Sequence, residues 1–142
     1  MKVKFKRLDS AATIPHKATP GAAAYDLYSI ENAYIPPGVT LLVCTGLVME
    51  IPEGWKGEIY SRSGLASQGL VVANSPGKID ADYRGEIKVA LLNTAREGII
   101  GIETGTRIAQ FEINPVHNIE FEEVKELSKS ERGLHGFGST GK

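Results

Sequence analysis

Two carboxylates and an aromatic ring lie close together in one polar segment of the chain. The segment spans residues 74–85 and carries Asp80, Asp82 and Tyr83. Apolar runs typical of strands flank it, and its opening Asn, Pro and Gly indicate a long hairpin. Such a loop is a common place for catalytic groups. The simpler interpretation is that both carboxylates only accept hydrogen bonds from turn amides. Because side chains alternate along a strand, Asp80 and Tyr83 reach one ligand only if the chain bends between them.

Two other segments have the composition of an anion site. Arg62-Ser63-Gly64 lies where an expected strand meets a turn, so free amides and a guanidinium are available to a phosphate. Residues 136–141 combine three glycines with two hydroxyls, and Arg132 precedes them. Successive glycine amides can form a nest for an anion. The alternatives are a capped turn with a solvated arginine and a disordered Gly/Ser tail.

A third carboxylate, Asp26, follows a run of small residues that lets another segment approach closely. This carboxylate is a candidate contact for Mg²⁺, which takes few protein ligands when substrate phosphates bind it. The sequence has no Cys/His cluster and no EF-hand spacing, so we expect no zinc or calcium site. His16, His117 and His135 lie in polar loops and are expected to be solvated.

Composition narrows the class of protein. The 142 residues fit one domain, and the formal net charge of −1 provides no field that attracts nucleic acid or an anionic membrane. The single cysteine, Cys44, excludes an internal disulfide and is expected to be a buried, inert thiol. The N-terminus lacks an apolar signal core, and no stretch approaches the ~20 apolar residues of a membrane span. We therefore expect a soluble cytoplasmic protein without nucleic-acid or membrane partners.

The elements that must position these groups are strands. Sixteen glycines and seven prolines separate short apolar runs, a pattern typical of an all-β sandwich or barrel. We expect residues 39–51 to form the central strand and Ser63 to cap a single helical turn over 63–68. The other expected strands are 2–8, 24–28, 55–60, 99–102, 107–113 and 119–124. Residues 1–127 are expected to form the β-barrel domain, and residues 128–142 a flexible glycine-rich arm.

Taken together and in order, five motifs resemble those of the trimeric dUTPase family over nearly the whole chain. The motifs are Pro20-Gly21-Ala22-Ala23-Ala24-Tyr25-Asp26-Leu27, Arg62-Ser63-Gly64-Leu65-Ala66, Asn74 with residues 77–85 (GKIDADYRG), residues 105–110 (GTRIAQ) and residues 132–141 (RGLHGFGSTG).

The resemblance implies a distorted jelly-roll-like β-barrel of the β-clip type, with at most one short helix and a flexible C-terminal arm. It implies a homotrimer whose active sites lie at subunit interfaces and receive the arm of another subunit. The implied reaction is Mg²⁺-assisted hydrolysis of dUTP to dUMP and pyrophosphate by water attack on the α-phosphorus. That reaction limits uracil incorporation into DNA and supplies dUMP for thymidylate synthesis.

The resemblance also implies roles for individual residues. Asp80 is the catalytic residue that activates the water, Tyr83 excludes a 2′-hydroxyl, and Asp26 contacts Mg²⁺ through water. Asp82 is left with a structural role. Together with Asp80 and Tyr83, the implied substrate-binding residues are Arg62, Ser63, Gly64, Asn74, Gly77, Lys78, Ile79, Lys88, Gln110, Arg132, Phe137, Gly138, Ser139 and Thr140.

Two positions depart from the family pattern. Ser61 precedes Arg62 where the family often has proline, and Thr106 precedes Arg107 where an acidic residue is frequent. We expect altered loop stiffness rather than lost activity. The rival readings are a dCTP deaminase-type enzyme, which shares the fold, and a non-catalytic regulatory β-barrel of the same fold.

Overall fold

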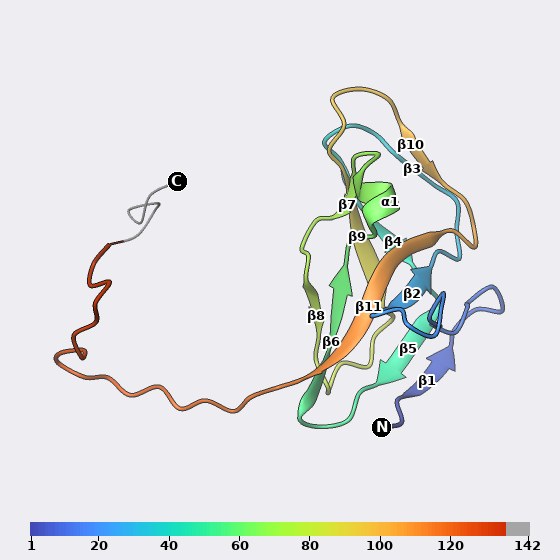
Figure 1. Ribbon diagram of the computed structural model, residues 1–142. Coiled ribbons are helices and arrows are strands. Elements are labelled where there is room, and N and C mark those ends of the chain that lie inside the picture. The colour runs from blue at the N-terminus through green and yellow to red at the C-terminus, as the bar shows by residue number, and fades with distance from the viewer. Residues whose placement is uncertain (136–142) are drawn as a thin grey trace.

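A computed structural model describes residues 1–135, and the regular secondary structure of this part consists of short antiparallel strands and one helical turn, joined by turns and loops (Figure 1). The elements are β1 (Lys4–Arg7), β2 (Tyr25–Tyr28), β3 (Ala33–Ile35), β4 (Thr40–Cys44), β5 (Leu47–Glu50), β6 (Trp55–Tyr60), α1 (Ser63–Ala66), β7 (Leu70–Val72), β8 (Gly77–Ile79), β9 (Lys88–Asn93), β10 (Ile100–Ile102) and β11 (Arg107–Pro115).

The strands form small sheets around a single core. A four-stranded sheet has the order β2-β11-β6-β8, a three-stranded sheet has the order β4-β9-β7, and β1-β5 and β10-β3 form two pairs. Several strands, such as β5 and β9, bury alternate residues, and the buried set includes Leu27, Ile59, Val89 and Phe111. Non-consecutive strands are neighbours throughout, as in a jelly roll. The all-β, jelly-roll-like fold with one short helix is therefore confirmed.

The expectation of one central strand over residues 39–51 is wrong. The run divides into β4 and β5, which belong to different sheets, and neither strand is central. The break is at Gly46, whose φ of 66° is disfavoured for other residues. A Cβ there would lie 2.9 Å from Ala12 Cβ. The continuous apolar run in the sequence therefore gave no sign of the bend, which depends on the glycine conformation and on close packing against Ala12.

Two smaller expectations also change. The N-cap of α1 is Arg62 without a side-chain capping bond, and Ser63 is already the first helical residue. The helical turn is followed by Gly69 with φ of 90°, as expected from its position. Strands β3 and β8 were not expected; each has only three residues and lies next to turn residues, namely Pro36-Pro37-Gly38 after β3 and Ser75-Pro76 before β8.

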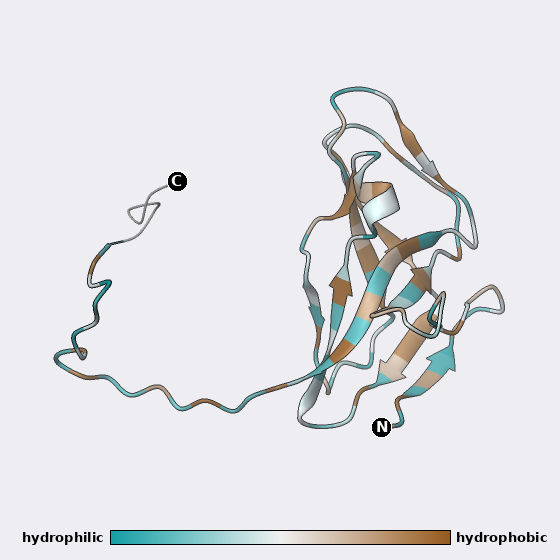
Figure 2. Ribbon diagram, viewed as in Figure 1, coloured by the Kyte–Doolittle hydropathy of each residue, from teal (hydrophilic) through white to brown (hydrophobic). Residues whose placement is uncertain are grey.

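All strands in the described part of the chain end by Pro115, and residues 116–135 are exposed along their whole length. We call this segment the arm; it extends away from the sheets (Figure 1). The strand expected at 119–124 is absent, because the segment lies beside no strand that could share backbone hydrogen bonds with it. Its alternation of hydrophobic and hydrophilic residues remains visible (Figure 2).

Within residues 1–135, no helix has the length and apolar character needed to cross a membrane.

Candidate active site

The hairpin segment between β7 and β9 is more than a turn. Its flanking strands pair with each other, whereas its middle, β8, pairs with β6 of the other sheet. The segment is therefore anchored in both sheets. The side chain of Asn74 lies over Gly77, where a Cβ would lie 3.1 Å from Asn74 Nδ2. Glycine at this position lets the amide of Asn74 approach the backbone of β8.

Tyr83 is held in a fixed position at the end of the hairpin. Its hydroxyl donates a hydrogen bond to the backbone carbonyl of Glu86 at 2.9 Å. The ring covers Gly85, where a Cβ would lie 2.3 Å from the hydroxyl oxygen. The ring is still 43% exposed, so it offers a surface on which a ligand can pack. The close approach explains why glycine follows two residues after the tyrosine.

The bend required between Asp80 and Tyr83 is present. The amide of Tyr83 donates to the carbonyl of Asp80 at 3.2 Å, which closes a turn over residues 80–83. The carboxylates of Asp80 and Asp82 are exposed, and neither accepts a hydrogen bond from another group within residues 1–135. The interpretation that they only satisfy turn amides therefore does not hold in this structure. Asp80 is free to act on a ligand or a water.

A second group of candidate residues lies on the outer face of the four-stranded sheet. Asp26 of β2 is directly opposite Gln110 of β11, and Gln110 is opposite Tyr60 of β6. Asp26 is 5% exposed, and its carboxylate accepts hydrogen bonds from Arg62 Nε at 2.9 Å and Arg107 Nη1 at 3.5 Å. The two guanidinium groups neutralise the buried charge.

Arg62 is fixed by these contacts. Its Nη1 also donates to the carbonyl of Arg107 at 3.3 Å, and the remaining N–H groups are available to an anion. Ser63 and Gly64 follow it and are exposed. Their amides precede that of Leu65, which makes the first hydrogen bond of α1. A guanidinium, a hydroxyl and two amides thus lie within three consecutive residues, a suitable set for phosphate oxygens.

The environment of Asp26 also affects an aromatic neighbour. Burial, followed by the nearby Asp26 carboxylate, raises the pKa of the Tyr28 hydroxyl. The imidazole of His16 stacks on the Tyr28 ring with centroids 5.4 Å apart. His16 is exposed, and one face of its ring packs against Tyr28.

The donor set at Asp26 fits a hard cation that is bound mainly by other ligands. Within residues 1–135 no group of three or more His, Cys, Asp or Glu side chains converges. One carboxylate with spare lone pairs can still accept a hydrogen bond from a water in the coordination shell of Mg²⁺ that is carried by substrate phosphates. The chain therefore fits Mg²⁺ in that manner and lacks the ligands of a protein-only cage in its described part.

The remaining expected residues are Lys88, Arg132 and four residues near the C-terminus. Lys88 starts β9, with its Nζ 3.6 Å from Glu86 Oε2. Arg132 lies on the arm, where its Nε donates to the carbonyl of His135 at 3.1 Å. Phe137, Gly138, Ser139 and Thr140 lie outside the described residues. The thiol of Cys44 is half-buried, and burial and nearby carboxylates raise its pKa.

Within a single chain, the hairpin and the group around Asp26 lie far apart. Ile79 is opposite Gly57 on β6, so Asp80 follows level with Lys56, whereas Gln110 is level with Tyr60. Asp80 and Gln110 are therefore two strands apart, at ~4.8 Å per strand, and four residues apart along the strand direction, at ~3.3 Å per residue. Together these offsets place their Cα atoms about 16 Å apart. Their side chains cannot hold one water at that distance.

Two charged residues were missing from the expected site. Arg107 contacts Asp26, and its place in the fourth motif was a signal that could have found it. Glu58 lies almost buried on the same sheet face as Gln110, with two lysines bound to it. A single acidic residue in a short strand gave no sequence signal for this cluster.

Known proteins resemble the chain over its full length. The family model described as dUTPase matches residues 10–141. A deoxyuridine 5′-triphosphate nucleotidohydrolase of Nautilia profundicola is 52% identical over 100% of both chains. The enzyme of the same name from Clostridioides difficile is 47% identical over 98% of this chain and 97% of its own. The dUTPase of Staphylococcus bacteriophage 80alpha, solved with dUPNHPP, has a TM-score of 0.88 and 33% identity over 99% of this chain and 98% of its own.

A further structural relative bears on the metal. A mutant dUTPase of the S. aureus phage phi11, solved to reveal the coordination of a structural Mg(II) ion, has a TM-score of 0.80. It is 27% identical and covers 89% of this chain and 98% of its own.

Proposed function

Because this chain belongs to the dUTPase family, we propose that it hydrolyses dUTP to dUMP and pyrophosphate. The observation that carries the proposal is the anchored hairpin, which presents a free carboxylate, Asp80, beside the fixed ring of Tyr83. In this proposal the family's reaction comes with its usual consequences, a supply of dUMP for thymidylate synthesis and less uracil in DNA.

The proposed chemical step requires little covalent work from the protein. Asp80 orients a water and accepts its proton as the water oxygen bonds to the α-phosphorus. The bond from that phosphorus to the α–β bridging oxygen breaks, and pyrophosphate leaves. A general base of this kind contributes typically ~10²–10⁴-fold to the rate. Mg²⁺ would be held by the phosphates and, through water, by Asp26, and would supply charge neutralisation.

The other residues bind and select the nucleotide. Asn74 and the backbone of Gly77, Lys78 and Ile79 read the uracil edge. The outer edge of β8, which pairs with no strand of residues 1–135, leaves room for the base. Tyr83 packs against the deoxyribose and excludes a 2′-hydroxyl. The phosphates are bound by Arg62, Ser63 and Gly64, and from the C-terminal segment by Arg132, Ser139 and Thr140. Phe137 covers the base, Gly138 belongs to the same substrate-binding segment, Lys88 lies near the substrate, and Gln110 positions the water.

The test is incubation with dUTP and dCTP while pyrophosphate and ammonia are measured. We expect pyrophosphate from dUTP alone. Ammonia from dCTP would replace this proposal with the deaminase reaction. Failure to act on either nucleotide would favour a regulatory barrel. The Asp80→Asn variant is expected to retain affinity for a non-hydrolysable dUTP analogue while its turnover falls by about 10²-fold or more.

We further propose that the chain is a homotrimer with sites shared between copies. The separation of about 16 Å between Asp80 and Gln110 supports this arrangement, because a second copy has to bring one of them to the other. A closed ring of three identical copies would provide three equivalent contacts of this kind.

An apolar groove supports the same proposal. The groove has a volume of about 410 Å³ and is lined by Val3 and Phe5 of the first strand region, Tyr25, Ile113 and others. Strand β1 pairs only with β5, so its second edge is free within the described chain. A free edge beside an apolar groove is suited to an added strand.

We propose that the groove receives residues 119–124 from the arm of another copy. In this segment Ile119 and Phe121 alternate with glutamates and are 69% and 88% exposed. The facing strand, residues 2–7, alternates apolar side chains with lysines. Paired strands would bring the apolar side chains together in the groove and the opposite charges together outside it.

One substitution at an exposed residue tests the proposed docking of the arm. Phe121→Asp is expected to weaken the trimer in sedimentation while the fold is retained, since the side chain contacts little within its own chain. The control is Leu127→Asp, because Leu127 is equally exposed at 87% but lies beyond the alternating segment. Equal trimer stability in both variants would disprove docking of residues 119–124.

A further inference from the structure

A compact charged network surrounds Glu58 on β6. The side chain is 8% exposed, and its Oε1 binds the ammonium groups of Lys78 and, at 3.1 Å, Lys56. Its Oε2 accepts hydrogen bonds from the Tyr60 hydroxyl at 3.0 Å and Asn114 Nδ2 at 2.6 Å. Lys78, followed by Asn114, lowers the pKa of Glu58 to about 2 against burial. The carboxylate is therefore charged at neutral pH and bound on both oxygens.

The network connects three strands of one sheet face. Glu58 is directly opposite Lys78 on β8, and Lys56 is opposite Asn114 on β11. The side chains of residues 56, 58 and 60 share the outer face, which is also the face of Gln110. The other face of β6 packs Gly57 against the Phe111 ring in the core. The network is thus separate from the core and continuous with the face that carries candidate site residues.

Strand β8 has few other attachments. It is three residues long, pairs only with β6, and has a free outer edge within the described chain. Its middle residue, Lys78, is bound to Glu58, and Asp80 follows two residues later. A short edge strand opens easily unless side chains hold it. The pair formed by Glu58 and Lys78 holds the strand at its centre.

We propose that Glu58 is a positioning residue for the nucleotide site, which fixes β8 through Lys78 and so keeps the base-reading backbone and Asp80 in place. This inference rests on the proposed function. Without the carboxylate, Lys56 and Lys78 repel each other, and the ordered strand becomes one of several states. Substrate then has to select that state, which raises the apparent dissociation constant without changing the ordered complex.

The test is Glu58→Gln, which keeps the size of the side chain and removes its charge. We expect KM for dUTP to rise about tenfold while kcat stays within about twofold of the parent. Hydrogen exchange of the amides of residues 77–80 is expected to accelerate relative to β11. The double variant Glu58→Gln/Lys78→Met is expected to be no worse than Glu58→Gln, because both changes break one contact.

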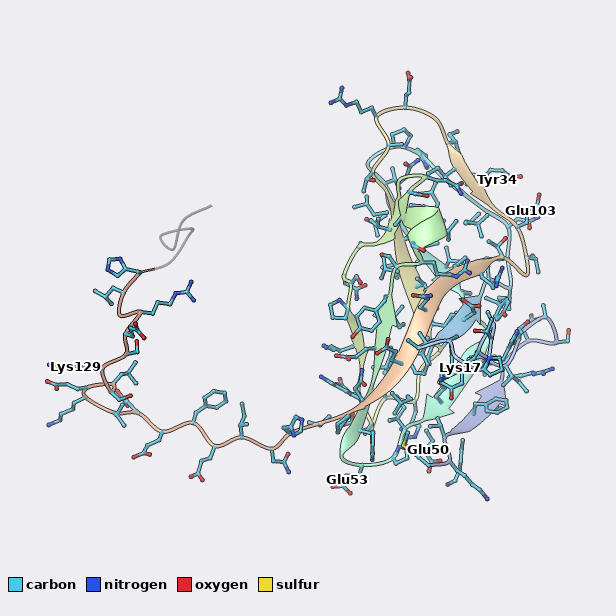
Figure 3. All side chains as sticks on the ribbon, in the orientation of Figure 1. Lys17, Tyr34, Glu50, Glu53, Glu103 and Lys129 are labelled. Atoms are coloured by element: carbon cyan, nitrogen blue, oxygen red, sulfur yellow. The ribbon has the colours of Figure 1, made fainter. Side chains whose placement is uncertain are left out.

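The matched control is Glu50→Gln. Glu50 is directly opposite Lys4 in another antiparallel pair, with Nζ to Oε1 at 2.8 Å, and is labelled in Figure 3. That pair is exposed, and its loss is expected to leave KM unchanged. An unchanged KM in Glu58→Gln, or exchange that accelerates equally in β6, β8 and β11, would overturn the inference. Because exchange needs no turnover, an inactive parent would refute the proposed function and leave this test intact.

Discussion

Mixing two inactive variants tests whether each site takes residues from two copies of the chain. One variant is Asp80→Asn, which lacks the proposed base, and the other is Gln110→Ala, which lacks the group that positions the water. Each variant alone is expected to turn over about 10²-fold more slowly than the parent. Asp80→Asn lacks the general base, and Gln110→Ala leaves the attacking water misplaced. Neither substitution removes a core side chain, since Asp80 is exposed and Gln110 lies on the outer sheet face.

The expected recovery follows from the separation of about 16 Å within one chain. If Asp80 and Gln110 come from different copies, a site is complete when the hairpin comes from a Gln110→Ala chain and its neighbour is an Asp80→Asn chain. In randomly mixed trimers from equal amounts, about a quarter of the sites satisfy both conditions. If both residues come from one copy, no mixed trimer contains a complete site.

The assay is pyrophosphate release after the two variants are unfolded together and refolded. We expect about a quarter of the parent rate from the mixture and almost none when the variants are refolded separately and then combined. Equal residual rates in both preparations would refute the shared site, provided that native mass spectrometry, which distinguishes the masses of the two variants, shows that the subunits have mixed.

Three further predictions concern nucleotide selectivity, the C-terminal segment over residues 132–142, and the dependence of stability on pH. Gly85→Ala would push the Tyr83 ring from its place, since the added Cβ would lie 2.3 Å from the hydroxyl; the preference for dUTP over UTP in kcat/KM is expected to fall about tenfold, and an unchanged preference would contradict the role of Tyr83. Deleting residues 132–142 is expected to preserve the trimer in sedimentation and nearly abolish turnover, so an active truncated chain would remove the C-terminal segment from the site. The folded-state pKa of Glu58 lies at about 2, below its ordinary 4.5, so its ionisation stabilises the fold above pH 4.5 and this contribution is lost as pH falls towards 2. Thermal unfolding of the parent is therefore expected to lose more stability over that pH range than that of Glu58→Gln, and parallel pH curves would contradict the assignment.

The motifs predicted local features of the hairpin because their information is local. The Asn, Pro and Gly near the start of residues 74–85 define a turn-rich segment, and the glycine of Tyr83-Arg84-Gly85 leaves room for the tyrosine ring. The need for a bend between Asp80 and Tyr83 followed from side-chain alternation alone, and the turn is present. The strand at Trp55–Tyr60 was also anticipated from its flanking turn residues.

Other features depend on contacts between residues far apart in the sequence. The apolar run over 39–51 read as one strand, but Gly46 bends it where Ala12 packs closely. The pairing of Arg107 with Asp26 joins the first and fourth motifs across two strands. The strand expected at residues 119–124 was wrong, because a strand needs a partner edge and no strand in the described part of the chain pairs with this segment.

By itself, then, the sequence determined the strand-rich class, the five motifs and the chemistry that each motif can perform, since turn residues, alternation and side-chain type act over a few residues. Only the tertiary structure decided that the hairpin is anchored in both sheets, that Glu58 binds Lys78 of β8, and that Asp80 lies far from Gln110 in one chain. These depend on which strands pair and in what register, because a shift of one residue would move every side chain to the opposite face.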